Sequence, residues 1–325
     1  MATIPTLTGP MDSAHLGVAL VHEHLNFRTG LSQCPPEFLD KNMDYHVRLL
    51  QDAAAVGVNT IVDCGPFPDL EQIVTLRDRA TGVNIVLCTG AYLEHGTPEP
   101  IRSFSEEEMA AHMRRDLTDG YEGFEDAGLR AGVIKVAART AELTDWEQKN
   151  FRAAARVQRE LQVPIVTHAC AGAREQMALL REHGAHIPAT FYSHVECERG
   201  WDGRDREQEV AYLAEVAAAG GYLLFNNFDF EFDTPWEDLV FLMDALEARG
   251  HGDRVLYSID TNWTVDEDGR IWHEQEKKHP KTGKRNYAYA ITHATPRLMQ
   301  SGVSLQRVWR YLVDNPRRYF EAFET

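Results

Sequence analysis

Two histidines separated by one residue, His22 and His24, follow an apolar run near the start of the chain. The run at residues 18–21 predicts a buried strand, and residues two apart in a strand point to the same side. Both imidazoles would therefore project together from the strand end, with Glu23 turned the other way. Neutral imidazoles are common ligands of zinc and related metals. The pair alone also fits two hydrogen-bonded histidines, so residues further along must decide between these interpretations.

Four more residues with metal-binding or catalytic chemistry lie in or directly after later apolar runs: Lys135, His168, His194 and Asp260. Four histidines and one carboxylate form a standard ligand set for zinc or a similar divalent ion. Lys135 is the exception, because a charged side chain in an apolar strand is costly unless it is paired. An ion pair with a neighbouring carboxylate would explain Lys135 alone. A lysine that has reacted with carbon dioxide would instead carry an anionic carbamate, which can bridge two metals.

Short apolar runs alternate with amphipathic segments along the chain. The pattern predicts strands at 18–21, 60–64, 84–89, 132–137, 164–167, 190–193, 221–225 and 254–259. It predicts helices at 36–56, 69–79, 105–120, 144–161, 172–184, 205–219, 235–249, 287–299 and 305–313. Eight strand-then-helix units in 325 residues indicate an α/β protein with a (β/α)8 TIM barrel. A doubly wound open sheet is the alternative, but no Gly-x-Gly-x-x-Gly follows the first strand.

In such a barrel the C-terminal ends of the strands form the rim on which active sites are built. The six residues singled out above would therefore converge there, which predicts a metal site. We expect one domain over residues 1–325, with a long polar loop at 262–285 after strand eight. A loop of this length in a compact domain is usually functional or disordered.

The ordered set resembles the phosphotriesterase-related branch of the amidohydrolase superfamily, and the resemblance covers nearly the whole chain. It rests on His-Glu-His at 22–24, Lys135, Val-Thr-His ending at His168, Tyr-Ser-His ending at His194, Ser-Ile-Asp ending at Asp260, and Asn-Pro-Arg-Arg at 315–318. The resemblance implies two metal ions. The more buried ion would be held by His22, His24 and Asp260, and the more exposed ion by His168 and His194.

The resemblance further implies that Lys135 is an N6-carboxylysine and bridges the two metals together with a hydroxide. Two cations ~3.5–4 Å apart lower the pKa of a shared water and polarise a carbonyl or phosphoryl oxygen. Asp260 would be catalytic as well as a ligand, because it would take the proton from the attacking hydroxide. Zinc is the first expectation for both sites, although manganese, iron, cobalt or nickel would suit the same ligands.

The family contains lactonases, carboxylic esterases and organophosphate triesterases. Hydrolysis of a lactone or of a carboxylic or phosphoric ester is the activity we predict. The alternatives are a protein whose main activity is organophosphate triester hydrolysis, a mononuclear deaminase, or a metal-binding barrel without turnover. Tyr92 falls where related lactonases carry a tyrosine over the metals, and Trp263 could wall the leaving-group side. A core or rim tyrosine is the other interpretation of Tyr92.

Composition sets limits on partners and location. The net charge of −17 argues against nucleic acid or an anionic membrane as partner, because both attract basic surfaces. The basic residues Lys277, Lys278, Lys281, Lys284 and Arg285 could attract an anionic substrate, or form an ordinary solvated face. No run approaches the ~20 apolar residues of a membrane span, and no signal-peptide pattern is present. Five scattered cysteines fit reduced thiols in the cytoplasm, and a homodimer is one assembly we consider.

Overall fold

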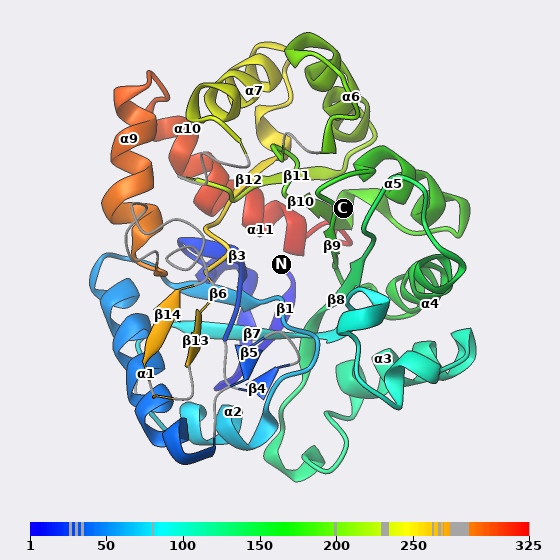
Figure 1. Cartoon of the computed structure of the whole chain (residues 1–325), viewed down its shortest axis with the longest axis vertical. Helices are drawn as coiled ribbons and strands as arrows, with labels where there is room; N and C mark the ends of the chain where they lie inside the picture. The colour runs from blue at the N-terminus through cyan, green and yellow to red at the C-terminus, as the bar shows by residue number, and fades with distance from the viewer. Residues whose placement is uncertain are drawn as a thin grey trace.

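Eight parallel strands, paired in the order β12-β11-β10-β9-β8-β7-β6-β3, form a nearly closed barrel. The computed structural model describes the chain except for residues 26–27, 30–31, 34–35, 80, 198–199, 229–233, 262, 266–267, 269, 274–285 and 325. Helices lie between successive strands and surround them as an outer ring (Figure 1). The predicted (β/α)8 barrel is therefore confirmed.

The barrel strands are β3 (Ala19–Glu23), β6 (Thr60–Asp63), β7 (Asn84–Gly90), β8 (Ala131–Ala137), β9 (Ile165–His168), β10 (Thr190–Ser193), β11 (Tyr222–Phe225) and β12 (Val255–Tyr257). The outer helices are α1 (Leu39–Ala55), α2 (Leu70–Arg77), α3 (Glu106–Thr118), α4 (Asp145–Leu161), α5 (Ala173–Glu182), α6 (Arg206–Ala218) and α7 (Trp236–Ala248). Near the C-terminus come α9 (Thr295–Gln300), α10 (Leu305–Trp309) and α11 (Asn315–Phe320). Each predicted strand is present within a few residues of its expected ends.

The seam between the first and last strands is closed by hydrogen bonds rather than by a regular ladder. The amide of His22 donates to the hydroxyl of Ser258, and that hydroxyl lies 3.1 Å from the carbonyl of His22. The amide of Asp260 donates to the same carbonyl at 3.2 Å. The strand ends that carry two of the predicted ligands are therefore tied directly to each other.

Alternation along the strands divides the core into two layers. In β8, Val133 belongs to the cluster inside the barrel, whereas Ile134 and Val136 pack against the outer helices. This period of two follows from the pleat of a strand. It turns Lys135 inward, toward the same side as Val133.

The opposite, N-terminal end of the barrel is closed by residues from both ends of the chain. A short antiparallel hairpin, β1 (Thr3–Thr6) with β2 (Gly9–Asp12), lies there, and its Leu7 amide donates to the carbonyl of Ile85 at the start of β7. Ile4, Tyr319 and Phe320 join the cluster inside the barrel. Patterning did not predict this hairpin, because its strands have only four residues each and include Pro5 and Pro10.

Capping accounts for several helix starts. Ser105, Thr144 and Asp205 each accept a hydrogen bond from the backbone three residues on, and the side chain at that position returns a bond to the cap. Such capping boxes satisfy amides that the helix itself leaves unpaired. Ser105 and Thr144 therefore cap the helices that the sequence placed after them.

Two expectations about the C-terminal third need correction. Residues 262–285 are not simply a loop, because β13 (Trp263–Val265) pairs with β14 (Ile271–His273) as an antiparallel hairpin. The helix expected at 287–299 begins only at Ala290, with a π-helical turn from Ala290 to Ala294 ahead of α9. A second π-helical turn, Arg310–Asp314, joins α10 to α11. Among the described residues, no helix is both long and apolar enough to span a bilayer.

Candidate metal centre

His22, His24 and Asp260 form the first group of potential ligands, at the joined ends of β3 and β12. Oδ1 of Asp260 lies 3.1 Å from Nε2 of His24 and 3.6 Å from Nε2 of His22. One potential ligand atom from each side chain lies within 4.8 Å of the other two. Two imidazoles and a carboxylate at these separations can share one divalent cation.

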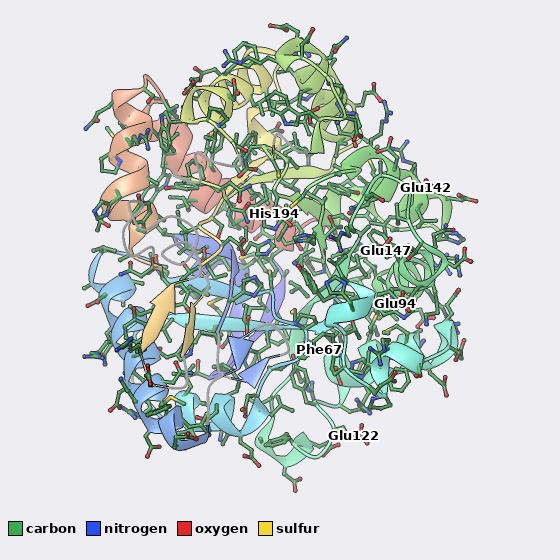
Figure 2. The ribbon with its side chains drawn as sticks, in the orientation of Figure 1. Phe67, Glu94, Glu122, Glu142, Glu147 and His194 are labelled. Atoms are coloured by element: carbon green, nitrogen blue, oxygen red, sulfur yellow. The ribbon has the colours of Figure 1, made fainter. Side chains whose placement is uncertain are left out.

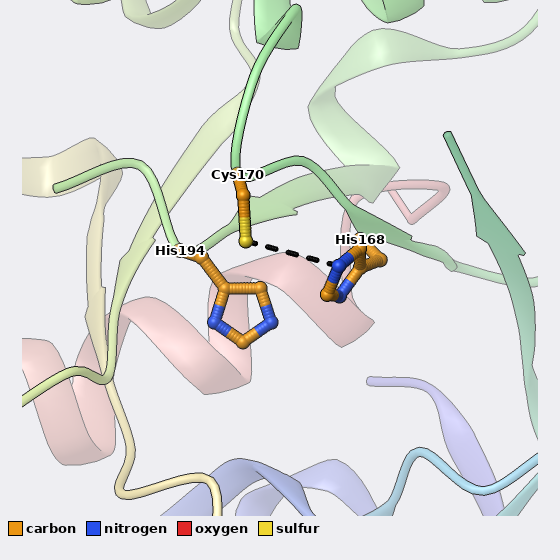
Figure 3. A group of neighbouring side chains, drawn as sticks. All are labelled: His168, Cys170 and His194. Atoms are coloured by element: carbon orange, nitrogen blue, oxygen red, sulfur yellow. Dashed lines mark hydrogen bonds between the residues drawn. The ribbon is translucent and has the colours of Figure 1, made fainter. Parts of the chain in front are cut away.

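His168 and His194, from the ends of β9 and β10, form the second group, with ring centroids 4.6 Å apart. His194 lies near the centre of the molecule in Figure 2, inside the ring of helices, whereas Glu122 and Glu142 lie at its edge. The thiol of Cys170 completes a cluster whose potential ligand atoms lie within 4.8 Å of one another (Figure 3). The two groups adjoin, because Oδ2 of Asp260 lies 3.9 Å from Nδ1 of His194.

Lys135 lies beside the first group and is almost completely buried, with 1% of its surface exposed. Its Nζ is 3.5 Å from Nε2 of His22, and none of the ion pairs among the described residues includes it. A neighbouring carboxylate, the simplest explanation for a buried lysine, is therefore not in contact with it in the described part of the chain. A buried cation without an anionic partner is costly, whereas a carbamate at this position would supply an anionic ligand.

An irregularity in β3 directs His22 into the site. Ala19 and Val21 belong to the cluster inside the barrel, so strict alternation would turn His22 outward. The pairing of β3 with β6 shifts register between Leu20 and Glu23, and the ring of His22 lies 6.2 Å from that of the interior residue Phe191. Bulges of this kind commonly re-aim a side chain beside an active site. The sequence predicted where His22 lies, but not this reversal.

His194 and Asp260 have positive backbone φ angles of 60° and 57°. This left-handed region is unfavourable for residues with a side chain and persists only where the surroundings hold it. His194 directly follows β10 and Asp260 comes three residues after β12, so the change of direction re-aims both side chains. The backbone conformation is therefore unfavourable at two of the predicted ligands, and contacts with surrounding residues must stabilise it.

Glu23 holds the backbone on both sides of Asp260. Its Oε1 accepts hydrogen bonds from the hydroxyl of Ser258 at 2.6 Å and from the amide of Ile259 at 2.8 Å. Its Oε2 accepts the amide of Thr261 at 2.7 Å. The glutamate between the two histidines is thus fully buried and positions the left-handed aspartate, because the amides before and after Asp260 donate to its two oxygens.

We predict that Glu23→Gln lowers the free energy of unfolding of the metal-free protein by about 1–3 kcal/mol. A glutamine has one acceptor oxygen, so its amide NH₂ would face a backbone N–H of Ile259 or Thr261. Urea titration measures the stability change, and the same variant should show a reduced kcat because Asp260 is less well held. Glu142→Gln, on the exposed surface, is the matched control and should change neither quantity. If Glu23→Gln kept wild-type stability and kcat, the hydrogen bonds from Glu23 to the backbone around Asp260 would be unimportant for both.

Three of the four histidines and Asp260 have protonation states that suit metal binding. Burial lowers the pKa of His22 and His168 well below the usual range and that of His194 to about 4. Burial acts to raise the pKa of Asp260, but its hydrogen bond with His24 and the adjacent imidazoles outweigh this and hold it well below the ordinary value. Near neutral pH these three imidazoles are neutral and the carboxylate is ionised, which are the forms that coordinate metals. Burial acts to lower the pKa of His24, but its hydrogen bond with Asp260 outweighs this and raises it, so His24 must give up its proton to bind a metal.

Buried polar residues next to the two groups of potential ligands contact the ligands or the backbone that carries them. The side chain of Asn226, directly after β11, lies beside His194 and acts to raise the pKa of that imidazole. Glu196 accepts the backbone amides of Asn226, at 2.7 Å, and of Asn227, joining the segments after β10 and β11. Asp63 accepts the amides of Leu25 and Gly65 and so braces the segment after His24. Such outer contacts orient metal ligands and tune their basicity.

Tyr92, predicted to contact substrate, lies after β7 with its ring edge-on to His168, at a centroid distance of 5.4 Å. It is partly exposed and therefore stands at the rim of the second group. Trp263 begins β13, and its predicted role stays a prediction. The basic cluster at residues 277, 278, 281, 284 and 285 lies outside the described residues, so the anionic substrate also stays a prediction.

Cys170 and Glu23 are the residues that pattern reasoning missed. Cys170 was expected only to be a reduced thiol, yet its Sγ lies 3.7 Å from Nε2 of His168. The signal was available in the spacing His168-Ala169-Cys170, which repeats the His-x-His spacing with a thiol as second donor. Glu23 gave no such signal, because its role depends on amides of the segment after β12, more than 230 residues away.

Comparison with known proteins identifies the family of the chain. The model of the phosphotriesterase family matches residues 2–320. A phosphotriesterase homology protein of Mycobacterium tuberculosis (strain CDC 1551 / Oshkosh) is 30% identical, over 99% of this chain and 98% of the relative. An aryldialkylphosphatase of Saccharolobus solfataricus is 26% identical, over 95% of this chain and 96% of the relative.

One similar solved structure is described as the engineering of organophosphate hydrolysis activity from a weak promiscuous lactonase template. It is 26% identical and superposes with a TM-score of 0.80, covering 98% of this chain and 99% of that one. The barrel fold, the histidines at its rim and the similarity to these relatives together define a metal-dependent hydrolase. The chain belongs to the phosphotriesterase family.

Proposed function

We propose that this protein hydrolyses a lactone or a related carboxylic ester at a centre of two divalent metals, with weaker activity on phosphotriesters. The observation that carries the proposal is the position of Asp260. Its Oδ1 faces His22 and His24, and its Oδ2 faces His194, so one carboxylate adjoins both groups of potential ligands. The family relatives and the lactonase-template structure support this reaction class.

In this proposal His22, His24 and Asp260 hold one metal, and His168 and His194 hold the other. When bound, two such cations supply hydroxide at neutral pH and polarise the substrate oxygen. Zinc is the metal we expect, and manganese, iron, cobalt and nickel would suit the same donors. Three of the imidazoles and the carboxylate already have the required charge states, whereas His24, whose pKa is raised by Asp260, would lose its proton when the metal binds.

Lys135 bridges the two groups as a carbamate in this proposal. The neutral amine adds to carbon dioxide, a nitrogen–carbon bond forms and one proton is released, which leaves one negative charge on the side chain. Its position beside His22, without an ion-pair partner among the described residues, supports the modification. Asp260 then accepts the proton that the attacking nucleophile loses, and Tyr92 lines the substrate side beside His168.

Metal removal and reconstitution test the proposal. Chelation should abolish hydrolysis of a lactone, and two equivalents of zinc or cobalt per chain should restore it. The measurement is lactone turnover against metal content, in parallel with an aryl ester, a phosphotriester and an aminopurine. Restoration by two equivalents with lactone as the best substrate is the expected result.

Each alternative gives a different outcome in the same experiment. A phosphotriester turned over faster than any lactone would make organophosphate hydrolysis the main activity. Full activity with one equivalent of metal, together with release of ammonia, would identify a deaminase. Binding of two equivalents without turnover of any substrate would identify a barrel that binds metal but does not catalyse.

A further inference from the structure

The second group of potential ligands contains a sulfur atom. Sγ of Cys170 lies 3.7 Å from Nε2 of His168, and the cluster of His168, Cys170 and His194 fits within 4.8 Å (Figure 3). The three side chains point toward one another from the ends of β9 and β10 and the segment after β9. The first group has a carboxylate as its third donor, whereas this group has a thiol.

The separation of sulfur and nitrogen agrees with shared coordination. Zinc–sulfur bonds of about 2.3 Å and zinc–nitrogen bonds of about 2.0–2.1 Å at a tetrahedral angle place the two donors about 3.6 Å apart. The observed 3.7 Å is close to this value. A metal could therefore bind both atoms with little movement of either side chain.

The backbone around Cys170 is firmly held. Nε2 of Gln176, on α5, donates to the carbonyls of His168 at 3.1 Å and Ala171 at 3.4 Å. The carbonyl of Cys170 packs against Gly200, where a Cβ atom would lie only 1.6 Å from that oxygen. Because this segment is fixed on both sides, the thiol is positioned toward His168 before any metal binds.

We propose that Cys170 is a third protein ligand of the metal held by His168 and His194. The proposal rests on the two-metal function above and adds to its ligand set. On binding, the sulfur–hydrogen bond breaks, a sulfur–metal bond forms and the proton passes to solvent. A thiolate adds one negative charge to this metal and favours zinc or cobalt over manganese, which prefers oxygen ligands.

Cobalt substitution tests the assignment with a readout other than activity. A cobalt ion bound by a thiolate has an intense near-ultraviolet sulfur-to-metal charge-transfer band, which imidazole and carboxylate ligands do not give. Wild-type protein with two equivalents of cobalt should show this band. Cys170→Ser should lose it and keep the visible bands of cobalt bound at His22 and His24, which also reports that the variant is folded.

Cys197→Ser is the matched control. Cys197 lies after β10, and its thiol hydrogen bonds to that of Cys170, but it is not part of the ligand cluster. The charge-transfer band should therefore survive in Cys197→Ser. Two bound cobalt ions without the band, or a band that persists in Cys170→Ser, would overturn the proposal and leave Cys170 as a hydrogen-bonding neighbour of His168. Failure to bind two cobalt ions would instead overturn the proposed function.

Discussion

Asp260→Ala is expected to lower kcat/KM for a lactone by about 10³-fold or more. Loss of a positioned proton acceptor alone typically costs 10²- to 10⁴-fold in rate, and this carboxylate is also a predicted ligand. Steady-state kinetics measures the loss, and metal analysis should show fewer than two equivalents bound. Both effects follow from a side chain whose two oxygens face different groups of ligands.

Asp253→Ala provides the matched control, because Asp253 is exposed at the opposite end of the same strand, β12. It should leave kcat/KM and metal content unchanged. If Asp260→Ala kept kcat/KM within tenfold of the wild type, Asp260 would be neither the proton acceptor nor an essential ligand. The proposed arrangement around it would then be wrong.

Lys135→Met is expected to reduce bound metal to at most one equivalent and to lower kcat/KM by at least about 10²-fold, since altering even an outer contact of a metal ligand costs 10- to 100-fold. The fold should survive, because replacing a buried charge by an apolar side chain of similar length is commonly neutral or stabilising. Metal analysis, kinetics and thermal unfolding of the metal-free protein measure the three effects.

Lys149→Met, on the outer helix α4, controls for the loss of a lysine and should change neither metal content nor kcat/KM. The carbamate adds a second test in the wild-type protein. Metal-free protein kept without carbon dioxide should bind two metals poorly, and added bicarbonate should restore binding. Full activity of Lys135→Met, or metal binding indifferent to bicarbonate, would contradict a bridging carbamate.

The barrel strands and the residues at their ends could be predicted from the sequence, because they depend on local hydrophobic patterns. One apolar run ends at Thr167 and is followed by His168, and another ends at Ser193 and is followed by His194. Both runs form strands in the structure, so each histidine lies at a strand end as the sequence predicted. Once eight such runs are closed into a barrel, their ends must share one rim. The convergence of the four imidazoles and Asp260 therefore followed from order and spacing along the chain.

The features that were missed arise from contacts between distant segments. The shifted register of β3 depends on pairing with β6, and the left-handed conformation of Asp260 depends on Glu23, far away in sequence. Neither has a local signature. The hairpin of β13 and β14 has strands of only three residues, too short for a period of two to stand out.

The closure of the barrel beneath the site has a consequence for turnover. Ile4, Tyr319 and Phe320 fill the end remote from His22 and His168, so the described side chains leave that end sealed. In the proposed hydrolysis, reactants and products then both use the C-terminal rim that carries the ligands, and each product must leave it before the next substrate molecule binds. The released products should accordingly act as competitive inhibitors of the forward reaction.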